Sequence, residues 1–394
     1  MEKKQTKPTA KKTIQKRGVA KKPTAKEQIN KKASTKLASV NTQTTKPKVD
    51  PKEKVNTKII CTLGPACEKF DTMQKMFDAG MSVARINMSH GTYDTLQSLI
   101  NTAKPLRRKG LELLIDTKGP EIRIGTFEKS EVELKKGQKF TLTTRGVPGN
   151  EHEVRLRYKI LVNQVKPGDI ILANNGQIKM KVVEVNSTDI VTKVLFGGKL
   201  SNNKSLNVPG VVPAAPYLSE QDKSDILFGM KNKPDYLALS FVSCAQDVID
   251  VKKFLKAKKC DKVKIIAKIE NGAGVKNASE ILKECDGLMV ARGDLGVEIP
   301  LEKLPMIQKK LISLCNVRRK FAIVATEMLE SMTYALRPTR AEVTDVANAI
   351  YEEANATMLS GETSVGRDPV MVVETMSKII REVEKVMYDT KIEF

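Results

Sequence analysis

Short apolar runs alternate with helix-like segments along most of this chain. From residue 57 onward the sequence contains eight such runs, each four to seven residues long. Segments such as 72–79, 246–256 and 307–317 separate them and repeat apolar residues at the spacing of an amphipathic helix. Alternating strands and helices indicate a parallel sheet, and eight units predict a closed (β/α)₈ barrel, the TIM barrel of the α/β class. The predicted strands are residues 58–63, 83–88, 113–116, 236–242, 263–269, 287–290, 322–326 and 356–360.

Residues 126–216 interrupt this alternation. They contain short β-prone stretches separated by Gly, Pro or Asn, and they lack helical periodicity. We therefore predict a small all-β domain inserted between the third barrel strand and its helix, a β-barrel lid over the barrel mouth. The β-prone stretches are 132–134, 139–143, 169–173, 178–185 and 189–194. The expected division of the chain is a tail at 1–56, a barrel at 57–125 and 217–394, and the lid domain at 126–216.

The first part of the chain has a different composition. Residues 1–54 hold sixteen Lys and one Arg against four acidic residues, so they contribute +13 to a net charge of +22. They include no aromatic and few large apolar residues, which predicts a disordered basic tail. Three interpretations remain open: a solvated tail, a segment that binds an anionic partner such as RNA, the ribosome or a membrane surface, and a targeting peptide.

Composition also limits the chemistry. The only histidines are His90 and His152, which nearly excludes a His-dependent triad or a multi-histidine metal site. None of the six cysteines forms a CxxC pair, which favours a reducing compartment over secretion. No apolar run approaches the roughly 18 residues that a membrane span needs. We therefore expect a cytoplasmic protein without a membrane span.

Polar residues end seven of the eight predicted strands. The carboxyl ends of barrel strands face one site, so these side chains are expected to meet there. A single Asp or Lys at a strand end is more often a cap or a surface pair, but repetition over successive strands indicates a site. The residues are Arg85, Asn87, Ser89, His90, Asp116, Thr117, Lys118, Ser240, Lys268, Glu270, Arg292, Asp294, Thr326, Ser360 and Glu362.

This set of side chains favours phosphoryl transfer. Glu270 and Asp294 supply two carboxylates to a Mg²⁺ ion that completes its shell with water and substrate oxygens. Lys268 and Arg85 would neutralise charge on the moving phosphoryl group. The residues alone therefore predict an anion-handling, Mg²⁺-dependent barrel enzyme.

Several longer motifs carry a family resemblance. ARINMSHG at 84–91, DTKGPEIR at 116–123 and MVARGDLGVE at 289–298 resemble signatures of the pyruvate kinase family. Further matching segments follow in the family's order at 57–66, 267–271, 325–332, 337–342 and 358–363, so the resemblance covers about residues 57–385. It implies an enzyme of glycolysis that transfers a phosphoryl group from phosphoenolpyruvate to ADP, giving pyruvate and ATP.

The resemblance implies roles for matching residues. Lys268 corresponds to the catalytic lysine, and Arg85 to the residue that holds the substrate phosphate. Thr326, with the backbone of Gly293 and Asp294, would hold the substrate carboxylate. Thr326 would also help to protonate the enolate that becomes pyruvate.

The implied cofactors are Mg²⁺ and K⁺. Glu270 and Asp294 match the family's Mg²⁺ ligands. Glu121 matches the position where K⁺-dependent members carry Glu, so we expect K⁺ dependence. The matching K⁺ ligands are Asn87, Ser89, Asp116 and Thr117, and the matching nucleotide contacts are His90, Arg123 and Lys204.

Some positions depart from the family pattern. Asn174 and Asn175 replace two lid aspartates, which leads us to expect weaker nucleotide binding. Glu353 replaces a Gly before the eighth strand, so that turn is either strained or different. Smaller departures are Met88, Ser205, Ala214, Ser243 and Glu327.

The family's C-terminal domain has no counterpart before Phe394. We therefore expect no effector activation, and the sequence leaves the oligomeric state open, with a homo-oligomer through the barrel compatible with it. Two alternatives to the pyruvate kinase reaction remain. One is a catalytically degenerate barrel that binds a partner through its basic tail, and the other is a different Mg²⁺-enolate barrel, against which the order of the motifs argues.

Overall fold

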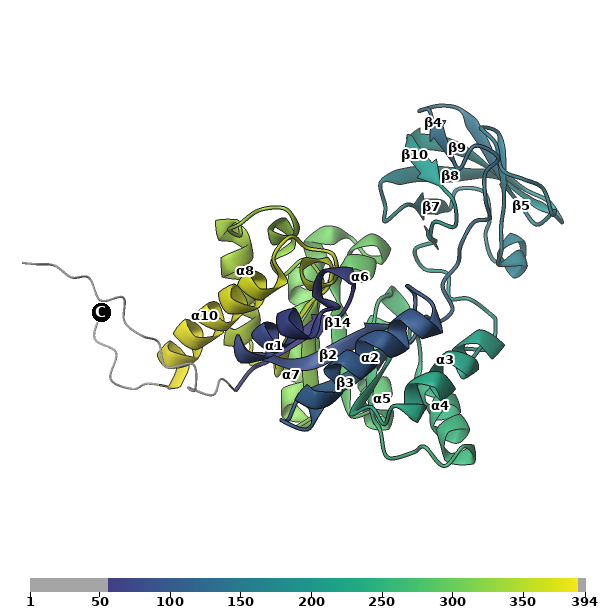
Figure 1. The fold of residues 1–394 in the computed structure, drawn as a ribbon. Coiled ribbons are helices and arrows are strands. Elements are labelled where there is room, and N and C mark those ends of the chain that lie inside the picture. Colours follow the sequence, from purple (N-terminus) through teal and green to yellow (C-terminus); the bar gives the residue numbers. More distant parts are fainter. Residues whose placement is uncertain (1–55, 389–394) are drawn as a thin grey trace, which may run out of the picture. The chain divides into compact units, whose positions relative to one another are not determined.

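Eight parallel strands form a closed barrel in the computed structural model, which describes residues 56–388 (Figure 1). Each predicted barrel strand is present, so the predicted (β/α)₈ fold is confirmed. The strands are, in their order around the barrel, β1 (Lys58–Thr62), β16 (Ala356–Leu359), β15 (Phe321–Ala325), β14 (Gly287–Ala291), β13 (Lys264–Ile269), β12 (Tyr236–Leu239), β3 (Glu112–Asp116) and β2 (Met81–Asn87).

Alternation along the strands creates two apolar layers. In β1, Ile60 packs in a cluster with residues from other strands such as Ile266 and Met289, whereas Ile59 and Cys61 belong to a larger cluster shared with the helices. Successive side chains of a strand point to opposite faces, which explains this separation. The smaller cluster fills the barrel interior, and the larger one joins the barrel to its helices.

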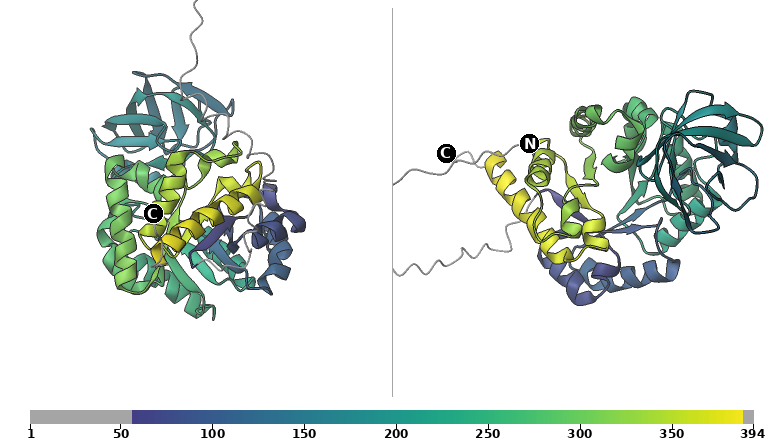
Figure 2. Two further views of the ribbon diagram at one scale, coloured as in Figure 1. Left: turned by 90° about the vertical axis from the view of Figure 1, so that its left-hand side faces the viewer. Right: turned by 90° about the horizontal axis from the view of Figure 1, so that it is seen from above.

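Helices follow the barrel strands as the periodicity predicts. The predicted segments 72–79, 246–256 and 307–317 correspond to α1, α4 and α7, with boundaries that differ by at most three residues. Helices α8 and α10 lie side by side on the outside of the barrel (Figure 2). The helices are α1 (Phe70–Asp78), α2 (Tyr93–Arg107), α3 (Glu220–Lys231), α4 (Ala245–Ala257), α5 (Gly272–Glu284), α6 (Arg292–Glu298), α7 (Leu304–Val317), α8 (Arg340–Tyr351), α9 (Gly361–Ser364) and α10 (Pro369–Tyr388).

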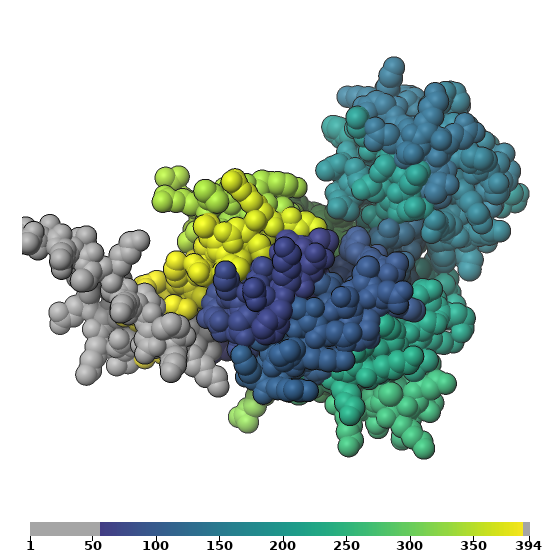
Figure 3. Space-filling view, in the orientation of Figure 1, coloured from purple at the N-terminus to yellow at the C-terminus, as the bar shows by residue number. Residues whose placement is uncertain are grey.

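The inserted segment consists of two sheets. One has six strands in the order β11-β7-β8-β9-β5-β6, and the other pairs β10 with β4. Its buried residues, among them Phe140 and Leu142, form a hydrophobic cluster of their own, and its atoms form a compact mass in the space-filling view (Figure 3). The strands are β4 (Glu131–Leu134), β5 (Lys139–Thr143), β6 (Glu153–Arg155), β7 (Ile170–Ala173), β8 (Ile178–Val185), β9 (Asp189–Phe196), β10 (Gly198–Ser201) and β11 (Leu206–Asn207).

The insertion leaves the barrel order intact. β3 and β12 flank it in the sequence, yet they pair directly, with Leu114 opposite Tyr236. One short 3-10 helix at Lys159–Asn163 is its only helical element among the described residues. The predicted all-β character is therefore confirmed apart from this turn.

The predicted basic tail falls almost entirely outside the described residues. Asn56 is the exception, and its backbone N–H donates to the carboxylate of Glu384 on α10. Within residues 56–388, no helix is long and apolar enough to cross a bilayer.

Candidate active site

Four interior apolar residues are each followed, two positions later, by a buried polar side chain. A strand keeps alternate residues on the same face, so these polar groups also point into the barrel, one step nearer the carboxyl ends of their strands. The apolar and polar partners are Val83 and Arg85, Leu114 and Asp116, Ala238 and Ser240, and Ile266 and Lys268. The barrel geometry therefore gathers charged and polar groups at one end.

Lys268 occupies the centre of this group. Its Nζ lies 3.0 Å from Asp116 Oδ1 and 3.1 Å from Glu270 Oε1, and it donates to Ser240 Oγ at 2.6 Å. Burial alone would lower the pKa of Lys268, but the carboxylates of Asp116 and Glu270 outweigh this and raise it above its usual value. The side chain is therefore an ammonium held by two carboxylates.

Arg85 is a second cation in the same cluster. Its Nε donates to Asp116 Oδ2 at 2.8 Å, and its Nη1 donates to Thr62 Oγ1 at 2.7 Å. Burial alone would raise the pKa of Asp116, but Lys268 and Arg85 hold it below its usual value. Asp116 therefore stays ionised and orients both cations.

Glu270 and Asp294 form a carboxylate pair with raised pKa values. Burial is the main reason that the pKa of Glu270 rises to about 7. The charge of Lys268 opposes this rise, and the charges of Asp294 and Asp116 add to it. Burial likewise raises the pKa of Asp294. Two carboxylates in this state fit a divalent cation, which would favour their ionised forms.

A Mg²⁺ ion at this position would need further ligands. Among residues 56–388 no group of three or more His, Cys, Asp or Glu side chains is placed to hold a metal. A pair of carboxylates therefore fits Mg²⁺ only if water or substrate oxygens complete its shell, which is its usual behaviour.

The four predicted K⁺ ligands come from neighbouring strand ends. Asn87 and Asp116 stand opposite each other in the β2–β3 ladder; Thr117 directly follows Asp116, and Ser89 lies two residues after Asn87. Asn87 Oδ1 accepts from the Ser89 N–H at 3.1 Å. The ladder thus puts an amide and a carboxylate residue side by side, with a hydroxyl residue close to each in sequence, and these oxygens are of the kind that hard cations prefer.

Thr326 lies just after β15 in an unusual conformation. Its φ is +69°, in the left-handed region that a β-branched residue rarely adopts. Its Oγ1 accepts from the N–H of Gly293 at 2.7 Å and donates to the carbonyl of Ala325 at 2.6 Å. Thr326 is therefore directly joined to the start of α6, where Asp294 also lies.

The predicted nucleotide contacts lie beside the root of the insertion. Ile124 N–H donates to the Lys204 carbonyl at 3.0 Å, and Arg123 Nη1 donates to the Asn203 carbonyl at 3.0 Å. Partial burial lowers the pKa of His90, and the charges of Arg123 and Arg85 lower it further. Arg123 and Arg85 thus make the surroundings of His90 electropositive, and the Lys204 backbone is hydrogen-bonded to the residue that follows Arg123.

Glu121 forms an ion pair with Arg123 in this region. Its Oε2 accepts from Arg123 Nε at 2.7 Å. Burial raises the pKa of Glu121, and the charge of Arg123 opposes that effect.

The sequence marked Ser240 and Arg292 as polar strand ends without assigning them roles. Ser240 Oγ donates to the Thr117 carbonyl at 2.7 Å and thereby joins Lys268 to the β3 end. Phe241, with a φ of +58°, donates its N–H to Glu270 Oε2 at 2.6 Å. No local sequence signal reveals such a backbone conformation, because tertiary contacts impose it.

Two departures from the family pattern now have structural descriptions. Asn174 and Asn175 have φ values of +51° and +54° in the turn before β8, a conformation that Asn tolerates well. Glu353 has a φ of +64°, so its turn remains left-handed and is strained by the side chain.

Comparison with known proteins identifies relatives of this chain. A family model for the barrel domain of pyruvate kinase matches residues 54–373. The chain is 46% identical over 339 residues to pyruvate kinase from Geobacillus stearothermophilus, covering 85% of this chain and 58% of that protein. It is 43% identical over 333 residues to pyruvate kinase from Thermotoga maritima, covering 84% of this chain and 71% of that protein. The chain thus spans less than two thirds of the Geobacillus relative.

Proposed function

The chain belongs to the pyruvate kinase family, and on that premise we propose that it transfers the phosphoryl group of phosphoenolpyruvate to ADP, giving pyruvate and ATP. The observation that carries this proposal is the position of Lys268 between Asp116 and Glu270, 3.0 and 3.1 Å away, at the carboxyl ends of the barrel strands. An ammonium in this position can stabilise charge that develops on a transferring phosphoryl group.

Phosphoryl transfer breaks the bond between phosphorus and the enol oxygen and forms a bond to a terminal oxygen of ADP. In the proposed site Lys268 and Arg85 carry the positive charges that face the phosphoryl oxygens. Asp116 holds both cations in place through its two carboxylate oxygens, 3.0 and 2.8 Å from them. The side chains are therefore positioned before substrate arrives, which lowers the reorganisation needed in the transition state.

Two cations are part of the proposal. Glu270 and Asp294 would hold Mg²⁺, and Asn87, Ser89, Asp116 and Thr117 would hold K⁺. When bound, the two ions would supply positive charge that helps to neutralise the phosphates and the substrate.

The enolate left by the transfer must gain a proton at its methylene carbon to become pyruvate. We assign Thr326 a part in this step because its hydroxyl lies at the start of α6, beside Gly293 and Asp294. We also assign the substrate carboxylate to Thr326 and the backbone of Gly293 and Asp294, which the hydrogen bond from Gly293 N–H to Thr326 Oγ1 holds together.

ADP would bind beside the root of the insertion. His90, Arg123 and Lys204 would contact its phosphates there, since Arg123 makes the surroundings of His90 electropositive and the Lys204 backbone is hydrogen-bonded to Ile124, the residue after Arg123. We place the reaction in the cytoplasm, because it belongs to glycolysis and the cysteines contain no CxxC pair.

The test is pyruvate formation from phosphoenolpyruvate and ADP with Mg²⁺, with and without K⁺. K⁺-stimulated turnover is expected in the wild type, and the Lys268→Met variant should lose it. Lys264→Met is the matched control, because Lys264 is exposed at the opposite end of the same strand and should not affect turnover. An inactive wild type, even at high ADP, would overturn the proposed function and direct attention to the basic tail.

A further inference from the structure

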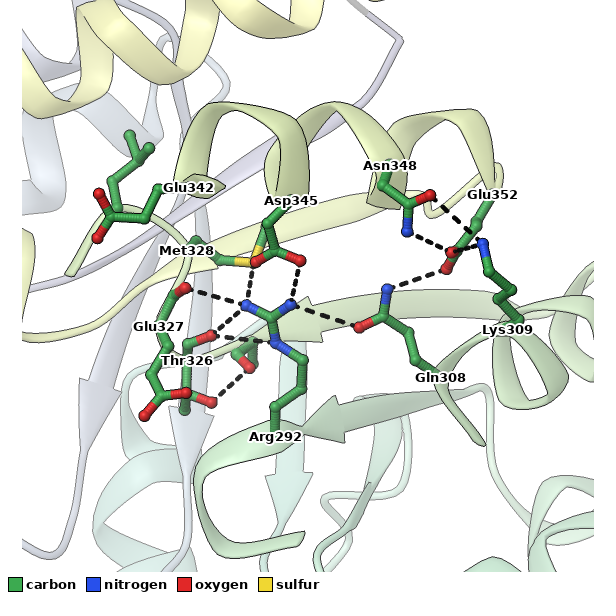
Figure 4. A network of polar contacts seen from close by, with 12 residues as sticks. Arg292, Gln308, Lys309, Thr326, Glu327, Met328, Glu342, Asp345, Asn348 and Glu352 are labelled. Carbon is green, nitrogen blue, oxygen red and sulfur yellow. Dashed lines mark hydrogen bonds and ion pairs between the residues drawn. The ribbon is translucent and has the colours of Figure 1, made fainter. Parts of the chain in front are cut away.

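Arg292 holds the backbone that follows β15. Its Nε and Nη2 donate to the Thr326 carbonyl at 3.2 and 2.6 Å, and Nη2 also donates to the Glu327 carbonyl at 3.1 Å. Figure 4 shows the guanidinium enclosed by these carbonyls, the sulfur of Met328 and the side chain of Asp345. Arg292 is only 7% exposed, so this arrangement lies in the protein interior.

The segment that Arg292 holds is strained. Thr326 and Glu327 have φ values of +69° and +53°, which are both left-handed. Neither residue is Gly, and Thr is β-branched, so this conformation persists only where surrounding contacts impose it. The guanidinium supplies such contacts, because a different backbone conformation would turn the two carbonyls away from their donors.

The same conformation places the Thr326 hydroxyl. Gly293 N–H belongs to the first turn of α6, where no intrahelical acceptor exists, and Thr326 Oγ1 accepts it at 2.7 Å. Arg292 is the first residue of α6 and precedes Gly293 in the chain. It therefore begins the helix and also holds Thr326, whose hydroxyl accepts the Gly293 N–H. The separation between Thr326 and the start of α6 therefore depends on Arg292.

Two side chains fix the guanidinium in turn. Asp345, on α8, accepts from Nη1 at 2.7 Å, and Gln308, on α7, lies 3.5 Å from the same nitrogen. Gln308 is itself held by Glu352 at 2.9 Å. The orientation of Arg292 is thus determined by two outer helices of the barrel.

We propose that Arg292 is a positioning residue, whose guanidinium holds the left-handed Thr326–Glu327 segment so that the Thr326 hydroxyl faces Gly293, and that Asp345 maintains its orientation from α8. The kinetic part of this proposal rests on the proposed function, in which Thr326 takes part in protonating the enolate. The structural part does not depend on any activity.

The chain contains a matched control for Arg292. Arg107 donates to the carbonyls of Asn232 and Lys233 at 2.8 Å each, and its Nη2 lies 3.1 Å from Asp235. Lys233 is also left-handed, with a φ of +49°. Arg107 therefore makes the same kind of contacts at the opposite end of the barrel, before β12.

The first experiment measures hydrogen exchange of the Gly293 amide, resolved by residue, in the full chain. Arg292→Lys keeps the charge but loses the forked donors, and the Gly293 amide should exchange about tenfold faster. Asp345→Asn should shift it in the same direction, and Arg107→Lys should leave it unchanged. Unchanged Gly293 exchange in both Arg292→Lys and Asp345→Asn would overturn the proposal, as would equal acceleration in Arg107→Lys.

The second experiment is a double-mutant cycle on pyruvate formation. Arg292→Lys should lower kcat by about 10- to 100-fold, since a small misplacement of a reacting group has effects of this size. The KM for phosphoenolpyruvate should rise by less than kcat falls, because Lys268 and Arg85, which would bind the phosphate, are untouched even though the carboxylate contacts shift. In a Thr326→Ala background the same substitution should change kcat by less than about threefold, since a positioning residue has nothing left to position.

The outcomes separate the two proposals. Equal losses of kcat in the two backgrounds would show that Arg292 does not act through Thr326. A wild type without turnover would overturn the proposed function, and the Gly293 amide would then decide the role of Arg292 alone. If Arg292→Lys does not fold, Asp345→Asn provides both readings while Arg292 remains in place.

Discussion

Lys268 and Asp116 form a buried ion pair, with 3.0 Å between Nζ and Oδ1 and side chains that are 9% and 1% exposed. The pair joins two strands that are not neighbours in the barrel, since β12 lies between β13 and β3. Buried charges of this kind are costly to separate, because each would be left without its partner in a medium of low dielectric constant.

Asp116→Asn should destabilise the protein by about 3 kcal/mol, since it leaves Lys268 and Arg85 without their shared counter-charge. Urea unfolding of the two proteins at neutral pH measures this difference. Glu284→Gln is the control, because it breaks an exposed pair with Lys252 at 3.1 Å and should cost less than about 1 kcal/mol. Equal losses of unfolding free energy in the two variants would show that the buried Asp116 pair stabilises the protein no more than an exposed pair does.

The cysteines should divide into two reactivity classes. Burial raises the pKa of Cys67 and Cys285 to about 11 and that of Cys315 to about 12, and it also raises the pKa of Cys61. Only the half-buried Cys244 and Cys260 should therefore react with a maleimide at pH 8 in the folded protein. Mass mapping before and after unfolding tests this, and native labelling of Cys315 as fast as that of Cys260 would contradict it.

Glu342 should contribute a pH-dependent part of the stability. Burial alone would raise its pKa, but hydrogen bonds from Ser331 and Thr339 outweigh this and hold it below the usual 4.5. Its stabilising effect is therefore complete above pH 4.5 and is lost as the pH falls through the lower folded value.

Glu342→Gln should accordingly be less stable than the wild type by about 1 kcal/mol at pH 7, and this difference in unfolding free energy should shrink as the pH falls below 4.5. Urea unfolding at several pH values measures the difference. Glu382→Gln, on an exposed part of α10, controls for the loss of one surface carboxylate. If the stability difference between wild type and Glu342→Gln grew in acid, the pKa of Glu342 could not be lowered in the folded protein.

Glu353→Gly should stabilise the protein. The left-handed φ of +64° suits Gly and strains Glu, so we expect a gain of about 1 kcal/mol in unfolding free energy. Glu382→Gly makes the same chemical change within a helix and should cost about 1 kcal/mol. Thermal unfolding of both variants tests the contrast, which a loss of stability in Glu353→Gly would refute.

The barrel could be predicted from sequence because its signals are local. Every predicted strand from 58–63 to 356–360 has its counterpart, since each apolar run is short and bounded, and all except 113–116 are followed by a segment with helical periodicity. Strands β6, β10 and β11 escaped prediction because each contains a single large apolar residue, which leaves no alternation to recognise.

The candidate site could be predicted only in part. Polar residues at strand ends identified the side chains that meet around Lys268, because barrel geometry carries them to one mouth. The left-handed backbone at Thr326 and Phe241 could not be predicted, since contacts with Arg292 and Glu270 from distant segments produce it. The role of Arg292 was hidden for the same reason, because Asp345 and Gln308 follow it by many residues and no local pattern links them.

The separate hydrophobic cluster of the insertion has a consequence for synthesis of the chain. Pairing of β1 with β16 closes the barrel, so Lys58 must wait for Ala356 to emerge from the ribosome before the ring is complete. The cluster that contains Phe140 and Leu142 includes no residue beyond Val211, and it can consolidate while the second half of the barrel is still being translated. The nascent chain would thus carry a finished domain inside an unfinished one, and its first three barrel strands would stay without their remaining partners until the rest of the barrel is made.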